Sequence, residues 1–261
     1  MRCNTAGWAS AEVVAALLGG AILTTGFVLW ELRAPVPMLP MRLFRSATFA
    51  AGNATSFLLF ASNFSTVFFM AQFQQIVLGQ DPLGAGIRLL PWTAPLFFVG
   101  PRAGALADRL GERPLVVLGL LMQAAGMVWI ALIAAPGLAY AAMIAPMVIS
   151  AGGIALAMPA VQKAVLGSVD PSQIGKASGT YNTTRWFGAV FGVAILVAVF
   201  TGTGSYASPA TFNHGFASAI AASAAIALIG AIAGLALPGR RTVLPSIRTG
   251  AAPVMETDAA S

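Results

Sequence analysis

The sequence predicts an all-α integral membrane protein, and three observations support this fold class. Hydrophobic residues make up 58% of the 261 residues and charged residues only 8%, whereas a soluble domain carries about 25% charged residues. The mean hydropathy is +0.84. A chain with so few polar groups cannot cover its own surface with them, so lipid must face much of it. The apolar residues also gather into long runs, and most basic residues stand between these runs.

Seven of the apolar runs reach or approach the length that crosses a bilayer, which is roughly 20 residues. We therefore expect seven transmembrane helices, at residues 11–30, 47–78, 83–101, 114–134, 138–163, 177–201 and 215–237. The second run is too long for one straight crossing and predicts a tilted helix. Pro91 and Pro95 should kink the third helix, and Pro159 the end of the fifth.

The basic residues predict how the helices are oriented. Cytoplasmic loops of membrane proteins carry an excess of Lys and Arg. The loops after the first, third and fifth runs hold most of the basic residues, namely Arg33, Arg42, Arg45, Arg102, Arg109, Arg113, Lys163 and Lys176. The other three loops hold none. We therefore expect the N-terminus outside, the C-terminus in the cytoplasm, and a multi-pass protein of the cell membrane.

Composition also excludes several classes of function. The net charge is +6, but the basic residues are scattered singly, so a nucleic-acid-binding patch is not expected. One cysteine, Cys3, and one histidine, His214, leave no disulfide and no Cys/His metal site. No cofactor is expected. Residues 1–30 resemble a signal peptide only superficially, because no cleavage pattern follows the apolar run.

Charged residues are concentrated in one short segment, Gly104–Arg113, which we call the signature segment. Its pattern G-x-L-x-D-R-x-G-x-R resembles the signature loop of the major facilitator superfamily of secondary transporters. That resemblance implies a cytoplasmic loop that acts as a latch between domains during alternating access. Its residues would be Gly104, Asp108, Arg109, Gly111 and Arg113. Both glycines should permit tight backbone geometry and close helix approach, and Asp108 should accept backbone N–H bonds or pair with a guanidinium. A basic turn that only sets topology is the alternative.

Other segments resemble one branch of that superfamily, the fourteen-helix drug:proton antiporters. They are 27–33, 37–45, 81–91 and 175–185. The resemblance implies a linker helix and loop (1–46), the six-helix C-terminal domain (47–237) and a disordered cytoplasmic tail (238–261). The N-terminal six helices, with the acidic residues tied to proton coupling, would then be absent from this chain.

One face of the second predicted helix carries a polar stripe. Its members follow spacings of three and four residues, and they are Asn53, Ser56, Phe60, Asn63, Val67, Met70 and Gln74. The resemblance makes this helix part of the central cavity, where amides with Phe and Met would suit a small amphipathic or cationic drug. Hydrogen bonding between helices, with no ligand, remains an equal alternative.

Two arginines lie within predicted spans, and a charge there suggests a functional site. Arg88 lies near the outer surface. Arg185 lies about two turns into the sixth span, near Asn182, where it would contact substrate or the domain interface. Bonding to carbonyl groups at helix breaks is the structural alternative. Gly188 and Gly192 form a G-x-x-x-G pattern that favours close helix packing.

The carboxylates bear on coupling, because a proton-driven carrier needs a titratable group in the transport path. None of the eight lies near the middle of a predicted span. We therefore interpret the chain as the C-terminal half of a multidrug:proton antiporter, with lipid and a drug-like substrate as partners and protons handled by the other half. A truncated, non-transporting remnant or an assembly partner is the alternative. An integral membrane enzyme is disfavoured, because no nucleophile and base come together.

Overall fold

The computed structural model describes residues 11–33 and 41–239, and the regular elements of this part are all helical. In chain order the α-helices are α2 (Ala11–Arg33), α3 (Ala47–Ile76), α4 (Pro82–Arg88), α5 (Leu90–Leu110), α6 (Glu112–Ile133), α7 (Tyr140–Leu166), α8 (Ile174–Thr203) and α9 (Pro209–Gly234). Two short 3₁₀ helices, η1 (Met41–Arg45) and η2 (Pro171–Gln173), precede α3 and α8. The all-α prediction is confirmed. Most of the predicted disordered tail, residues 240–261, lies outside the described residues.

Among the described residues, six helices are long and apolar enough to span a membrane, with α4 and α5 together forming one of them. These six correspond to the second to seventh predicted spans. The first predicted span corresponds to α2, which has 23 residues and is therefore about 34 Å long at 1.5 Å per residue. Its apolar stretch, Leu18–Glu31, is shorter than those of the six. The result is a multi-pass membrane protein with an N-terminal helix.

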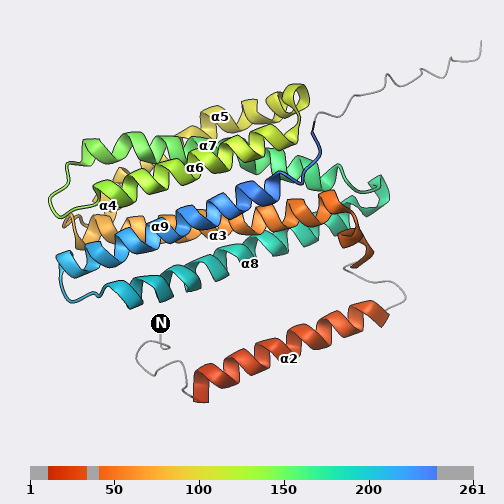
Figure 1. Ribbon diagram of the computed structural model, residues 1–261, viewed down its shortest axis with the longest axis horizontal. Coiled ribbons are helices and arrows are strands. Elements are labelled where there is room, and N and C mark those ends of the chain that lie inside the picture. Colours follow the sequence, from red (N-terminus) through yellow and green to blue (C-terminus); the bar gives the residue numbers. More distant parts are fainter. Residues whose placement is uncertain (1–10, 34–40, 240–261) are drawn as a thin grey trace, which may run out of the picture.

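The six spans form one bundle, with α2 beside it (Figure 1). Helix α3 packs against α8, α9 and α7, while α6 packs against α7 and α9. Helix α5 lies on the outside of α7 and is the least buried of the spans. The start of α3, the α5–α6 junction and the α7–α8 connection share one end of the bundle, which carries Arg109, Arg113 and Lys163. We call it the basic end.

Glycines allow the closest helix contacts in the bundle. A Cβ added to Gly126 of α6 would lie 2.6 Å from the carbonyl oxygen of Pro146 in α7. Gly119 of α6 and Gly153 of α7 also face each other along the same helix pair, and a Cβ added to either would collide with the carbonyl oxygen of the other. The backbones of α6 and α7 therefore touch directly, as small residues permit in membrane proteins.

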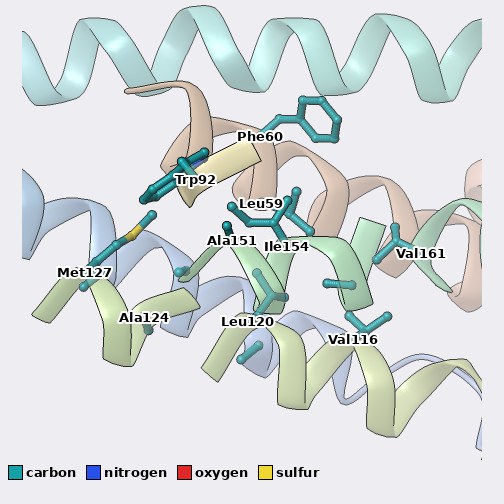
Figure 2. Close-up of a cluster of buried hydrophobic side chains, with 14 of the residues drawn as sticks. Leu59, Phe60, Trp92, Val116, Leu120, Ala124, Met127, Ala151, Ile154 and Val161 are labelled. Carbon is teal, nitrogen blue, oxygen red and sulfur yellow. The ribbon is translucent and has the colours of Figure 1, made fainter. Parts of the chain in front are cut away.

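The interior has an apolar part and a polar part. Figure 2 shows the apolar cluster, in which Leu59, Trp92, Leu120 and Ile154 come from α3, α5, α6 and α7 respectively. The polar part was not predicted from the sequence. It joins α3, α6 and α9: Gln123 Nε2 donates to Ser62 Oγ (2.8 Å), Ser223 Oγ donates to the Ser62 carbonyl (2.8 Å), and the Thr66 and Ser223 hydroxyls bond to each other (2.8 Å).

The third predicted span differs from the structure in two ways. The helix is interrupted at Leu89, before either proline, where α4 ends and α5 begins. Pro91 has no N–H with which to continue the helical hydrogen bonds of α4. The Leu89 N–H instead donates to the Gly86 carbonyl (3.1 Å). Helix α5 then continues to Leu110, so the prediction that residues 102–113 form a loop is wrong. Only Gly111 separates α5 from α6, with φ 89° and ψ 164°, a conformation that is nearly exclusive to glycine.

The fifth predicted span also ends later than expected. Helix α7 runs to Leu166 with Pro159 in its interior, about two turns before its end. Neighbouring helices in a bundle can satisfy the backbone groups that an internal proline frees. Lys163, expected in a loop, therefore lies in the last turn of α7.

Candidate substrate site

The signature segment forms a helix end rather than a loop. Gly104 lies inside α5, where an added Cβ would meet nothing within 4 Å, so the expected close approach at this residue is wrong. Gly111 is buried and makes the turn between helices. Arg109 and Arg113 are exposed at the basic end.

Asp108 has a different partner from the one expected. Its carboxylate forms an ion pair with the ammonium group of Lys163, which joins α5 to α7 within the bundle. From the sequence we expected a guanidinium or backbone N–H groups as its partner instead. Both side chains are accessible, 38% for Lys163 and 70% for Asp108.

The polar stripe of α3 lies mostly inside the bundle. Met70 and Gln74 are fully buried, and the Gln74 amide points at the Met143 sulfur of α7 (3.7 Å). Asn53 and Ser56 are also buried, whereas Asn63 is half-buried. Most of the stripe therefore packs inside the bundle, and Ser56 and Phe60 lie beside Tyr181 and Trp186 of α8.

Arg185 of α8 is surrounded by aromatic rings. Its Cζ atom lies 5.3 Å from the ring centroid of Phe60, 5.8 Å from that of Tyr181 and 5.7 Å from that of Trp186. In Figure 2 the Phe60 ring points toward α8, away from the apolar cluster. Such cation–π contacts stabilise a guanidinium, most strongly where water is excluded.

Several polar side-chain atoms of α3 and α8 have no hydrogen-bond partner. They are buried, and they are the Arg185 Nε, the Tyr181 hydroxyl, the Ser56 Oγ, and the side-chain oxygens of Asn53 and Asn63. The Tyr181 hydroxyl neighbours Ser56 and Arg185, but none of these contacts has hydrogen-bond geometry. Buried polar groups without partners are rare and costly, so this cluster is the strongest candidate binding site.

We call Ser56, Phe60, Asn63, Tyr181, Arg185 and Trp186 the α3–α8 site. Tyr181 and Trp186 were not predicted as site residues, although Tyr181 lies four residues before Arg185, on the same face of a helix. Asn182, which was predicted there, bonds instead to the Ser178 carbonyl of its own helix (2.9 Å).

Two glycines of α8, Gly188 and Gly192, allow α8 to approach α3 closely beside the site. A Cβ added to Gly192 would lie 2.5 Å from the Cα of Ala61, and one added to Gly188 would lie 2.9 Å from the carbonyl carbon of Phe57. The backbones of α3 and α8 therefore touch there. Arg88 lies elsewhere: its guanidinium stacks on Tyr140 (5.1 Å), whose hydroxyl donates to the Arg88 carbonyl (3.1 Å).

Comparison of the sequence with known proteins identifies the family of this chain. The sequence profile of the Major Facilitator Superfamily matches residues 3–193. The chain belongs to the Major Facilitator Superfamily. Its relatives within the superfamily include the cephamycin export protein of Amycolatopsis lactamdurans, which is 34% identical over 89% of this chain and 48% of its own length.

Two further relatives come from mycobacteria. The multidrug resistance protein Stp of Mycobacterium tuberculosis is 29% identical over 74% of this chain and 36% of its own length. The multidrug efflux pump LfrA of Mycolicibacterium smegmatis is 32% identical over 74% of this chain and 38% of its own length. The chain thus spans half or less of the length of these relatives.

Proposed function

We propose that the chain is the C-terminal half of a drug-efflux transporter that exchanges amphipathic compounds for protons by alternating access. The names of its relatives, which refer to antibiotic export and multidrug efflux, support the transport of drug-like compounds. The positive-inside distribution of basic residues supports a place in the cell membrane, with the N-terminus outside and the basic end in the cytoplasm.

The α3–α8 site is the observation that carries this proposal. Its aromatic rings offer apolar contact, and its unsatisfied amide, hydroxyl and guanidinium groups offer hydrogen bonds to a ligand. Ligand sites combine these two features, with many apolar contacts and a few polar groups that orient the ligand. A single α3–α8 wall would become a cavity when the second half of the transporter faces it.

Proton coupling would depend on groups outside this bundle. The carboxylates of the six described spans and their connections, Asp81, Asp108, Glu112 and Asp170, lie at helix ends or in the connections between helices. A proton relay requires a titratable group in the transport path. We propose that the complementary half supplies that group.

Transport assays test the proposed function. The purified chain is reconstituted in liposomes alone, or together with the N-terminal half of the cephamycin export protein, and the uptake of a fluorescent amphiphile is followed under a proton gradient. We expect flux that depends on the gradient only when both halves are present. If neither preparation moves or binds the amphiphile, the chain is a non-transporting membrane protein and the proposal fails.

The genome offers a second test. Sequencing the DNA upstream of the Met1 codon should reveal six or seven further apolar spans in frame, or as a neighbouring gene. A promoter directly before Met1, with no such spans nearby, would contradict the proposal.

A further inference from the structure

We propose that Arg185 is a substrate-anchoring residue that binds the carboxylate of an anionic amphiphile. This inference rests on the proposed function, because it names the class of compound that the α3–α8 site takes. It also reverses the expectation from the sequence that the aromatic residues of α3 suit a cationic drug.

The charge of Arg185 is not neutralised within the part of the chain that the structure describes. No carboxylate forms an ion pair with it there, and its Nε has no hydrogen-bond partner although it is buried. A guanidinium carries five N–H donors in a planar fork. The rings of Phe60, Tyr181 and Trp186 contact the guanidinium without accepting conventional hydrogen bonds from it. Donors therefore remain for a further ligand.

The aromatic rings favour an anion because Arg185 already occupies them. A cationic drug would need a free aromatic face, yet the Phe60 and Tyr181 rings already contact the guanidinium. A second positive charge a few ångströms away would also be repelled strongly in a medium of low dielectric constant. A carboxylate is attracted instead, and it matches the guanidinium fork through two parallel hydrogen bonds.

The neighbours of Arg185 suit the rest of such a ligand. The Ser56 and Tyr181 hydroxyls lack partners and can donate to a second anionic oxygen or accept from a polar group. Trp186 is 52% exposed and makes an edge or tilted contact with Phe60 and Phe64, so an apolar ring can pack there. Arg185 itself is half-buried, which leaves it accessible from that side.

A set of matched probes tests the charge preference. The full chain is placed in nanodiscs of phosphatidylcholine, and energy transfer from tryptophan to pyrene reports binding, with empty nanodiscs correcting for partitioning into lipid. The probes are pyrenebutyrate, pyrenebutyramide and a pyrenebutyl trimethylammonium ion, which share one apolar body. We expect the carboxylate to bind at least about tenfold more tightly than the amide, as a charge-assisted hydrogen bond implies, and the ammonium ion to bind most weakly.

Variants distinguish the effect of the Arg185 charge on binding from an effect on the structure of the site. Arg185→Gln should weaken binding of the carboxylate probe much more than binding of the amide probe, so that the two affinities become about equal. Arg185→Lys should keep part of the preference, because it keeps the charge but loses the planar fork. Arg88→Gln, at the second arginine within a span, is the control and should change none of the affinities.

Each contrary outcome has a distinct meaning. Equal affinities for the three probes, or a carboxylate preference that survives Arg185→Gln, would overturn the anchoring role but leave the drug site standing. Equal affinities are also the result expected if Arg185 pairs with a carboxylate of another protein segment. Failure of all three probes to bind saturably would contradict the drug site itself, and with it the proposed function.

Discussion

Identical residues have different physical roles at different places in this bundle. Gly192 permits the backbone of α8 to touch the backbone of α3, whereas Gly104 of α5 has open space where a side chain would lie. Both glycines lie within helices, and both belong to sequence patterns for which we expected close helix packing. Only the surroundings, which the sequence does not display, distinguish a packing requirement from a neutral position.

An alanine at each of these two positions should therefore have opposite effects. Gly192→Ala should destabilise the protein by about 1–3 kcal/mol, because the new methyl group would overlap α3 and force the helices apart. Gly104→Ala should be neutral or stabilising by up to about 1 kcal/mol, as alanine favours a helix interior. Thermal unfolding in detergent compares the two variants, and equal melting temperatures would contradict the prediction.

At the scale of elements, the junction between α5 and α6 is the least expected feature. The ten residues of the signature segment contain a single non-helical residue, Gly111, so the two helices are joined almost directly. Its combination of φ 89° and ψ 164° suits glycine and almost no other residue.

Gly111→Ala should accordingly strain the junction. We expect a loss of about 1–3 kcal/mol in the free energy of unfolding, since alanine has no stable conformation in that region. Gly100→Ala in the interior of α5, where an added Cβ meets nothing within 4 Å, is the matched control and should not destabilise. Denaturation in mixed micelles measures both, and a stable Gly111→Ala variant would mean that the junction relaxes into another conformation.

The ion pair between Asp108 and Lys163 should contribute little to stability. Both groups are substantially exposed, and such pairs contribute about 0–1 kcal/mol. Asp108→Asn should lower the melting temperature only slightly, and the difference should shrink in high salt because salt screens exposed charges. A loss of several kcal/mol in unfolding experiments would show that the pair is a structural requirement instead.

Hydropathy was sufficient to predict where helices exist, but not where they end. Six predicted spans reappear as helices because apolar length dictates membrane crossing. The ends of α5 and α7 were placed too early, because charged residues such as Asp108 and Lys163 were assigned to loops although a helix can project past the lipid. The α3–α8 site was predicted in part: Arg185 stands out as a charge in a span, but its contacts with Phe60 and Tyr181 depend on which helices are neighbours.

At the scale of the whole molecule, the distribution of charge predicts the orientation in the membrane. Connections at the basic end carry the lysines and arginines, while the α8–α9 connection at the opposite end carries none between Thr203 and Pro209. Both ends are solvent-facing in a multi-pass protein, so labelling from one side of the membrane can distinguish them.

Cysteine labelling in intact cells checks this orientation. With Cys3→Ser as the background, Ser205→Cys should react with a membrane-impermeant maleimide, whereas Arg113→Cys should react only after the membrane is broken. Labelling of both in broken cells serves as the control for accessibility. The reverse pattern in intact cells would invert the proposed topology.

The buried polar network has a consequence for how the protein is made. Thr66 and its hydrogen-bond partner Ser223 are separated by 157 residues. A ribosome that adds ~5–20 residues per second therefore needs about 8–30 s after completing α3 before α9 emerges. During that interval the Thr66 hydroxyl has no Ser223 to bond to, whereas the Ser62 and Ser65 hydroxyls already donate to carbonyl groups of their own helix. The bond between Thr66 and Ser223 can therefore form only late in synthesis, once α9 has joined the bundle.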